Sequence, residues 1–278
     1  LITNQAKPPG RTVIDGMPNA EYHAHPAVSN SLLTQISRSP MHARAYLDGH
    51  RFAPTTAMQF GTAAHAAILE PARFAAEFKA FDGNLRTKAD KEEYRRLSEL
   101  GWSLVSAGDW DAIAAMAIAA RSHQTAGPLL SGGVVEQSVF WTDEESGVPC
   151  KCRPDLWRDD GIAVDVKTTE DASPAGFSRS MATYRYHVQA AHYMAGTGAD
   201  RFLFVAIEKK HPYAVAVYEL DEASLDLGRM QRALDLAAYA ECARTGIWPG
   251  YSEEVEPLSL PGWAFPKPES EEIEVEYV

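Results

Sequence analysis

Two aspartates and a lysine stand close together between Cys152 and Thr168, where the chain reads C-R-P-D-L-W-R-D-D-G-I-A-V-D-V-K-T. The residues Asp159-Asp160-Gly161 predict a hairpin loop, because a type I turn followed by a left-handed glycine joins two antiparallel strands. That register places Asp155 directly opposite Asp165, with Cβ atoms about 5 Å apart. Two facing carboxylates repel unless a cation lies between them, so the hairpin predicts a divalent-metal site.

Lys167 follows Asp165 by two positions, so both side chains project from the same face of the strand. The alternative is an exposed hairpin in which Lys167 only neutralises Asp165. The apolar residues 162–164 and Val166 instead favour a strand with some burial. A buried charge needs a partner or a metal, so burial of this strand favours a metal site over an exposed ion pair.

This segment resembles the P-D…(D/E)-x-K signature of the restriction-endonuclease-like nuclease superfamily, through Pro154-Asp155 and Asp165-Val166-Lys167. More narrowly, the chain is similar to the RecE-type (exonuclease VIII-like) phage and prophage exonucleases, which are also similar to the RecB nuclease domain. The narrower resemblance runs from about residue 29 to about residue 248 and rests on three further stretches: Gly61-Thr-Ala-Ala-His65 as a G-x-x-x-H helix, Asp165-Val-Lys-Thr-Thr169 as a D-x-K-T-T strand, and Gln189-Ala-Ala-His-Tyr193 as a Q-x-x-x-Y helix.

The resemblance implies an α/β fold with a restriction-endonuclease-like (PD-(D/E)XK) core: a central mixed sheet with a strand meander, flanked by helices, and a helical N-terminal elaboration. It implies a Mg²⁺-dependent exonuclease, with Mn²⁺ able to substitute. Such an enzyme degrades linear double-stranded DNA from 5′ ends and leaves 3′ single strands for a recombinase or a single-strand annealing partner. It also implies a homo-oligomeric ring, with a tetramer as the expected form and DNA passing through its centre.

We expect Asp155 and Asp165 to hold the catalytic metal together with the Val166 carbonyl, and His65 to complete a second or shared site. Lys167 would orient or deprotonate the attacking water, or neutralise charge in the transition state. Taken alone, a histidine in an Ala-rich helix is more typical of a packed core. The two downstream aspartates favour ligation, because imidazole and carboxylates together bind divalent metals.

Three more residues join the catalytic candidates. Gln189 and Tyr193 are spaced i, i+4, so they share a helix face and could contact substrate near the metal; helix-to-sheet packing is the alternative. Glu136 lies in the apolar stretch 134–141, which enters a second hairpin. The meander can bring Glu136 beside Asp155, although the longer turn leaves its register free by a residue.

Net charge is the main argument against a nucleic-acid substrate. The chain has 38 acidic and 26 basic residues and a formal charge of -12, whereas a general nucleic-acid binder usually shows a basic face. Acidic residues concentrate from Glu253 onward, and a ring could reconcile an acidic exterior with a basic channel. The basic residues expected near the site are the DNA-binding candidates, with a solvated surface as the alternative for each: Arg86, Lys88, Lys91, Lys151, Arg153, Arg179 and Arg185.

The 278 residues, 45% of them hydrophobic, are divided into an N-terminal extension (1–28), a single nuclease domain (29–250) and an acidic, Pro-rich tail (251–278). Residues 29–121 are expected to be helical, with one helix capped by Ser29 or Asn30, one opening after Gly61, and others over 90–104 and 109–123. Residues 134–169 predict three strands in a meander. The Gln189 helix, strands over 201–207 and 213–218, and a helix over 225–244 follow.

The sequence predicts a cytoplasmic enzyme with no membrane partner. No apolar run reaches the length of a bilayer span, and no signal-peptide pattern opens the chain. The first residue is Leu1 rather than Met, which leaves open a fragment or a processed chain. Some relatives in the superfamily hold an iron–sulfur cluster on four cysteines, whereas this chain has only Cys150, Cys152 and Cys242. We therefore expect no cluster.

Two alternatives to a double-strand exonuclease stay open. One keeps the nuclease fold but makes the protein an endonuclease or a single-strand nuclease. The other is a non-catalytic DNA-processing module, against which the intact set of Asp155, Asp165 and Lys167 argues, because a binding module has no need of facing carboxylates.

Overall fold

A computed structural model describes residues 10–50, 55–261 and 264–265. Within them, a central sheet has the strand order β10-β9-β8-β7-β4. Strands β8 and β9 are parallel, and the other neighbours are antiparallel, so the sheet is mixed as expected. Its strands are β4 (Val134–Val135), β7 (Leu156–Trp157), β8 (Ile162–Thr169), β9 (Arg201–Glu208) and β10 (Val215–Glu219).

A second, smaller sheet contains β1 (Arg11–Ile14), β5 (Ser138–Thr142) and β6 (Pro149–Cys152), in the order β1-β5-β6. The predicted meander is therefore divided between two sheets. The expectation of one continuous meander of three strands over residues 134–169 is wrong. Two breaks explain the division: Glu136 has a left-handed backbone, with φ 49°, and Pro154 has no N–H to continue a ladder. Asp155 consequently lies in a bend just before β7 rather than on a strand.

The hairpin between β7 and β8 confirms the predicted register. Leu156 pairs with Val164 and Trp157 with Ala163, and the Arg158 N–H donates to the Ile162 carbonyl at 2.9 Å. Gly161 has φ 79°, the left-handed conformation that the turn requires.

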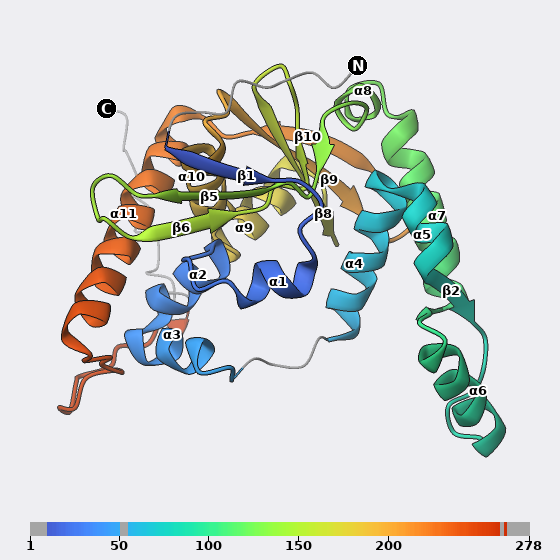
Figure 1. Ribbon diagram of the computed structural model, residues 1–278, viewed down its shortest axis with the longest axis horizontal. Coiled ribbons are helices and arrows are strands. Elements are labelled where there is room, and N and C mark those ends of the chain that lie inside the picture. The colour runs from blue at the N-terminus through green and yellow to red at the C-terminus, as the bar shows by residue number, and fades with distance from the viewer. Residues whose placement is uncertain (1–9, 51–54, 262–263, 266–278) are drawn as a thin grey trace, which may run out of the picture.

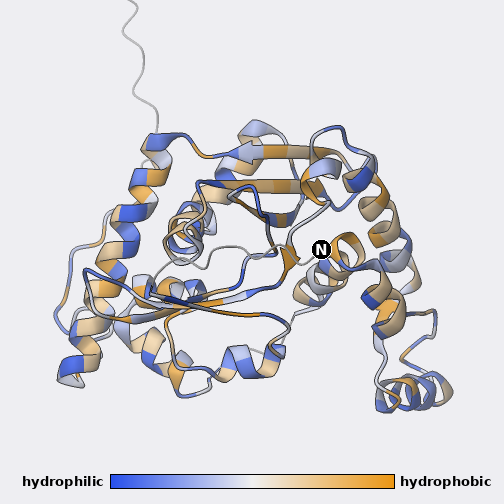
Figure 2. Ribbon diagram, turned by 45° about the horizontal axis from the view of Figure 1, so that its top comes forward, coloured by the Kyte–Doolittle hydropathy of each residue, from blue (hydrophilic) through white to orange (hydrophobic). Residues whose placement is uncertain are grey.

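Helices cover both faces of the central sheet (Figure 1). On one face, Val164 and Val166 of β8 pack against a cluster from α4 (Thr56–Leu69), α5 (Pro71–Glu77), α7 (Ala107–Ser122) and α8 (Ala126–Leu129). On the other face, Ala163 and Phe204 pack against residues of α9 (Pro174–Thr183), α10 (Tyr186–Thr197) and α11 (Glu222–Thr245). Figure 2 shows apolar residues along the central strands, which are buried from both sides.

The N-terminal helices α1 (Asn19–Ala24), α2 (Asn30–Arg38) and α3 (Pro40–Leu47) lie beside the smaller sheet and α11. The Ser29 side chain accepts from the Leu32 N–H at 3.4 Å and caps α2, as predicted. Residues 11–28 are also part of the fold, because β1 pairs with β5. Val28 in addition forms a bridge with Cys150.

An arm made of β2 (Phe78–Phe81), α6 (Lys88–Glu99) and β3 (Ser103–Ser106) projects from the body at the lower right of Figure 1. The helix expected over 90–104 therefore ends at Glu99 and is followed by a strand. The helix that carries His65 also differs from expectation. It begins at Thr56, capped by the Thr55 hydroxyl, which places Gly61 inside the helix rather than before it.

No helix of the described residues is both long and apolar enough to cross a bilayer. The described part of the predicted tail, 251–261 and 264–265, contains no α-helix or strand, and the rest of the tail, including most of its glutamates, lies outside the described residues.

Candidate active site

Alternation along β8 places Asp165 and Lys167 on the face of the sheet that α10 covers, with Ala163. Asp165 is 2% exposed. Its Oδ1 accepts a hydrogen bond of 2.6 Å from Nε2 of Gln189 on α10. The Gln189 side chain therefore lies next to the acidic strand, as its helix position predicted.

The second carboxylate oxygen of Asp165 is paired with a lysine. Lys167 Nζ lies 2.6 Å from Asp165 Oδ2 and forms an ion pair with it. Oδ2 is buried, and the Lys167 ammonium is the positive charge that compensates it. A buried carboxylate needs such a partner or a metal, so a cation could take the same position.

Asp155 completes a compact group of charges. Its Oδ2 accepts from the Val166 N–H at 2.7 Å, and Nδ1 of His65 on α4 lies 3.5 Å from the same oxygen. Because the N–H and C=O of a strand residue point to the same side, the Val166 carbonyl is directed to the Asp155 edge. The structure thus brings together His65, Asp155, Asp165, Val166 and Lys167 from α4 and the β7–β8 hairpin.

The pKa values of the two carboxyl groups diverge. Burial raises the pKa of Asp165 to about 6, and nearby Asp155 adds to the rise, although Lys167 opposes it. Burial would also raise the pKa of Asp155, but the charge and hydrogen bond of His65, then Lys167, outweigh it and lower the value. Two carboxyl groups with opposite shifts in one small site are typical of functional centres.

The pKa values of the two basic groups are both raised. Burial would lower the pKa of Lys167, but Asp165 and Asp155 outweigh it and raise the value. Burial would likewise lower the pKa of His65, and Asp155 and Asp165 again produce a net rise. His65 is 29% exposed at its side chain, and the choice between metal ligation and packing stays a prediction.

The donor set fits a hard divalent cation. Asp155, Asp165 and the Val166 carbonyl offer oxygens and His65 offers a nitrogen, a combination that suits Mg²⁺ and Mn²⁺. Among the described residues, however, no three His, Cys, Asp or Glu side chains already form a closed metal-binding cluster. Lys167 occupies the position at Asp165 Oδ2, so cation binding requires the Lys167 ammonium to move aside.

Two other catalytic candidates lie near the site without joining it directly. Tyr193, one turn after Gln189, packs edge-on against Phe202 at 5.8 Å between ring centroids. Burial is the first cause that raises the pKa of Tyr193, and Asp165 and Asp155 add to it.

Glu136 lies beside Asp155 through its backbone, because its N–H donates to the Asp155 carbonyl at 3.2 Å. Its side chain is 41% exposed and pairs at 3.8 Å with Arg73 of α5. The structure therefore places the Glu136 carboxylate against an arginine rather than against the other carboxylates.

Several basic residues expected to bind DNA are used inside the protein. Arg185 forms a largely buried ion pair with Asp235 at 2.7 Å, and Arg153 donates to the Ser138 hydroxyl at 2.7 and 3.0 Å. Lys151 Nζ, 4% exposed as a residue, donates to backbone carbonyls at the end of α1. All three side chains therefore make contacts within the fold, and their role in DNA binding stays a prediction.

The remaining basic candidates are exposed. Arg179 on α9 is 72% exposed and lies 3.6 Å from Asp171. Arg86 precedes α6 and Lys88 opens it, and both belong to the projecting arm rather than to the carboxylate site. Lys91 lies on the same helix, so these three could meet DNA only at a distance from the two aspartates.

Sequence reasoning missed Tyr186, the first residue of α10. Lys167 Nζ lies over its ring, 4.6 Å from the centroid. Tyr186 is three residues before Gln189, so the helical period places both on the face that meets β8. The i, i+3 spacing of Tyr186 and Gln189 in the sequence could have indicated that Tyr186 also lies near the site.

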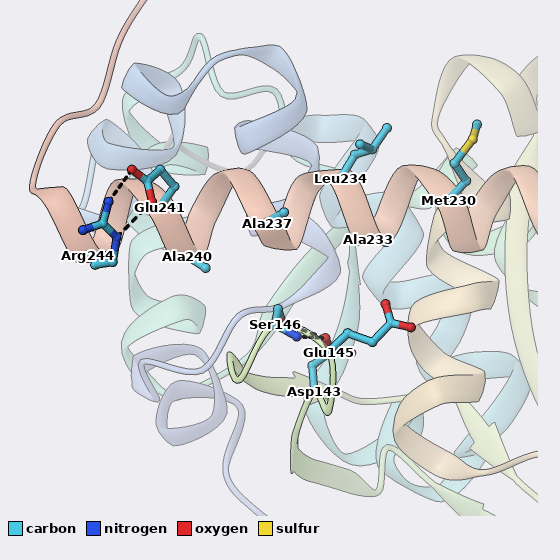
Figure 3. A pocket seen from close by; sticks show the side chains of 10 residues that line it. All are labelled: Asp143, Glu145, Ser146, Met230, Ala233, Leu234, Ala237, Ala240, Glu241 and Arg244. Carbon is cyan, nitrogen blue, oxygen red and sulfur yellow. Dashed lines mark hydrogen bonds and ion pairs between the residues drawn. The ribbon is translucent and has the colours of Figure 1, made fainter.

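A groove of about 600 Å³ lies elsewhere, between α11 and the turn of the β5–β6 hairpin (Figure 3). Asp143 at its edge is engaged with Arg232 at 2.5 Å. Its helix side presents Met230 and Leu234, both more than half exposed. Its charged lining residues are Asp143, Glu145, Glu241 and Arg244, and Glu241 pairs with Arg244 at 2.6 Å.

Comparisons with known proteins bear on the fold and the family of the chain. A search of curated proteins found no match. A solved structure described as "Putative exonuclease" from Eubacterium rectale is 15% identical, covers 86% of this chain and 92% of that chain, and has a TM-score of 0.53, which supports a shared fold. The structure of SSO0001 is 17% identical over 64% of this chain and 86% of that chain, with a TM-score of 0.28.

The family model described as "PDDEXK-like domain of unknown function (DUF3799)" matches residues 29–261. The matched span contains both aspartates, Lys167, His65 and Gln189. It also confirms the expected restriction-endonuclease-like fold, with a central mixed sheet between helices. This chain belongs to the family of PDDEXK-like domains.

Proposed function

We propose that this protein is a divalent metal-dependent exonuclease that hydrolyses linear double-stranded DNA from 5′ ends and leaves 3′ single-stranded tails. The observation that carries the proposal is the convergence of Asp155, buried Asp165, Lys167 and His65, with Lys167 2.6 Å from Asp165 and His65 3.5 Å from Asp155. A PDDEXK-like domain with this arrangement is suited to phosphodiester hydrolysis. The exonuclease and the 5′ polarity rest on the resemblance of the motifs to RecE-type enzymes.

Asp155, Asp165, the Val166 carbonyl and His65 are the groups that would hold Mg²⁺ or Mn²⁺. When bound, the cation supplies charge that polarises the phosphate and lowers the pKa of the attacking water. Gln189 fixes the orientation of Asp165 through the hydrogen bond to Oδ1. That bond leaves Oδ2 as the oxygen directed to the cation.

Lys167 has the role of a positive charge at the scissile phosphate. Its ammonium remains protonated because Asp165 and Asp155 raise its pKa above the ordinary value. A protonated amine cannot act as a general base, so the electrostatics favour stabilisation of transition-state charge over deprotonation of water. The Tyr186 ring below Nζ limits the directions in which the ammonium can move.

The substrate form separates this proposal from its alternatives. Linear duplex labelled at either the 5′ or the 3′ end, closed-circular duplex and single-stranded DNA are each incubated with protein and Mg²⁺. The proposal predicts early release of 5′ label from linear duplex, slower loss of 3′ label, and intact circles. Nicked or linearised circles would indicate an endonuclease, and degradation of single strands alone would indicate a single-strand nuclease.

We also propose a homo-oligomeric ring, with a tetramer as the expected form, and delivery of the 3′ tail to an annealing protein or a recombinase. The ring accounts for activity on DNA despite a formal charge of -12, because basic residues can face a channel while acidic residues face solvent. Sedimentation velocity tests it directly, since a monomer at all concentrations would contradict the ring.

A further inference from the structure

A pocket of about 300 Å³ lies directly beside the carboxylate site, on the α9–α10 side of β8. It is lined by Thr168 and Thr169, which follow Lys167 in the strand, and by Tyr184 and Tyr186 at the junction of α9 and α10. Its volume is at the lower end of the range for small-ligand pockets. None of the proposed metal ligands lines it.

The aromatic rings of this pocket form a stack that reaches the catalytic lysine. Tyr184 and Tyr186 are stacked, with centroids 5.6 Å apart and planes 28° apart. Tyr186 in turn stacks on buried Phe204 at 5.9 Å and lies under Lys167 Nζ at 4.6 Å. Tyr184 is 62% exposed, whereas Tyr186 is half-buried, so Tyr184 is the more accessible ring of the pair.

The backbone that displays Tyr184 is strained and firmly held. Arg185, between the two tyrosines, has φ 56°, a left-handed conformation that is unfavourable for a side-chain-bearing residue. Its guanidinium is fixed by Asp235 at 2.7 Å and by the Leu33 carbonyl at 3.3 Å. Backbone strain maintained by buried contacts is concentrated at functional sites, which indicates a role for the tyrosine pair.

Charges around the pocket compensate one another. Lys209 lies 3.3 Å from Glu170, and Arg179 lies 3.6 Å from Asp171. All four residues line the pocket, so its titratable lining has two positive and two negative groups. A balanced rim with an exposed aromatic face suits an uncharged planar group better than an isolated phosphate.

We propose that Tyr184 is a stacking platform for a nucleobase at the end of the DNA strand that enters the active site. The inference rests on the proposed nuclease function and names a base subsite next to the scissile phosphate. Only a terminal or unpaired base has a face free to stack, because bases within a duplex are covered on both sides. Stacking on Tyr184 would hold the end of the strand while Lys167 meets the phosphate.

The test is binding of the full chain to short duplex DNA that carries 2-aminopurine at its 5′-terminal nucleotide, with Ca²⁺ in place of Mg²⁺ to prevent cleavage. Wild type and Tyr184→Phe are expected to bind and to quench the fluorescence, because both keep the ring. Tyr184→Ala should lose the quenching and bind about 5- to 150-fold more weakly, the range for one base–aromatic stack. Tyr251→Ala, which removes another exposed tyrosine, 70% exposed and next to His42, should behave as wild type.

A second duplex with an abasic 5′-terminal position separates stacking from a general structural effect. Wild type and Tyr184→Ala should bind this duplex equally, because no base remains to stack. Equal weakening by Tyr184→Ala on both duplexes, or unchanged quenching, would overturn the base subsite while leaving the nuclease proposal intact. A wild-type protein that neither binds nor cleaves DNA would overturn both, and equal melting temperatures of the variants show that folding is not the cause.

Discussion

Replacing Asp165 by asparagine should stabilise the metal-free protein at high pH and make no difference at low pH. The folded chain raises the pKa of Asp165 from 3.8 to about 6, so this residue binds a proton more tightly when folded. The associated stability is complete below about pH 4 and is lost as the pH rises through 6. A shift of about two units at about 1.4 kcal/mol each amounts to about 3 kcal/mol at pH 8.

Asparagine imitates the protonated carboxyl group and escapes this cost, so the Asp165→Asn melting temperature at pH 8 should exceed that of wild type by about 6–12 °C. Thermal melts with a chelator at pH 4.5 and pH 8 measure the effect. Asp143→Asn is the matched control with opposite sign, because hydrogen bonds from Ser146 and Arg232 overcome burial and lower the pKa of Asp143. That variant should be destabilised at pH 8. Equal melting temperatures of wild type and Asp165→Asn at pH 8 would show that the folded protein does not raise the pKa of Asp165.

Three further substitutions test the site and its framework. Lys167→Ala should reduce turnover by orders of magnitude and leave duplex affinity in Ca²⁺ almost unchanged; parallel losses of rate and affinity would instead make Lys167 a phosphate anchor. His65→Ala should abolish Mg²⁺-dependent cleavage with little change in melting temperature, and Mn²⁺ should restore part of it if imidazole is a ligand; a large fall in melting temperature with normal activity would favour a packing role. Gly228→Ala should destabilise the protein by roughly 1–3 kcal/mol in urea unfolding, because the added Cβ would clash with the His187 carbonyl on α10. The control is Gly108→Ala in α7, where the added Cβ meets open space, and this variant should be neutral or slightly stabilising in the same assay.

The hairpin and its charges were predictable because their determinants are local. Asp159, Asp160 and Gly161 specify the turn, and the turn sets the register that places Asp155 against β8. The alternation of β8 then places Lys167 beside Asp165 without any knowledge of the rest of the chain. The helix period similarly placed Gln189 near the strand, where the structure shows its bond to Asp165.

The features that could not be predicted depend on residues far apart in the sequence. Arg185 appeared available for phosphate, and its partner Asp235 lies 50 positions later on α11. Lys151 likewise donates to carbonyls more than 120 positions earlier. The division of the meander between two sheets follows from Pro154, which the sequence shows, and from the left-handed backbone of Glu136, which its residue type does not predict.

We propose that Asp155 and Asp165 hold a divalent cation that enables phosphodiester hydrolysis. The most direct measurement is digestion of end-labelled linear duplex by chelator-treated wild type, Asp155→Ala and Asp165→Asn, before and after addition of Mg²⁺, with circular dichroism to verify folding. We expect no cleavage without Mg²⁺, cleavage by wild type once Mg²⁺ is added, and no cleavage by either folded variant. Mg²⁺-dependent cleavage retained in both variants would contradict this proposal.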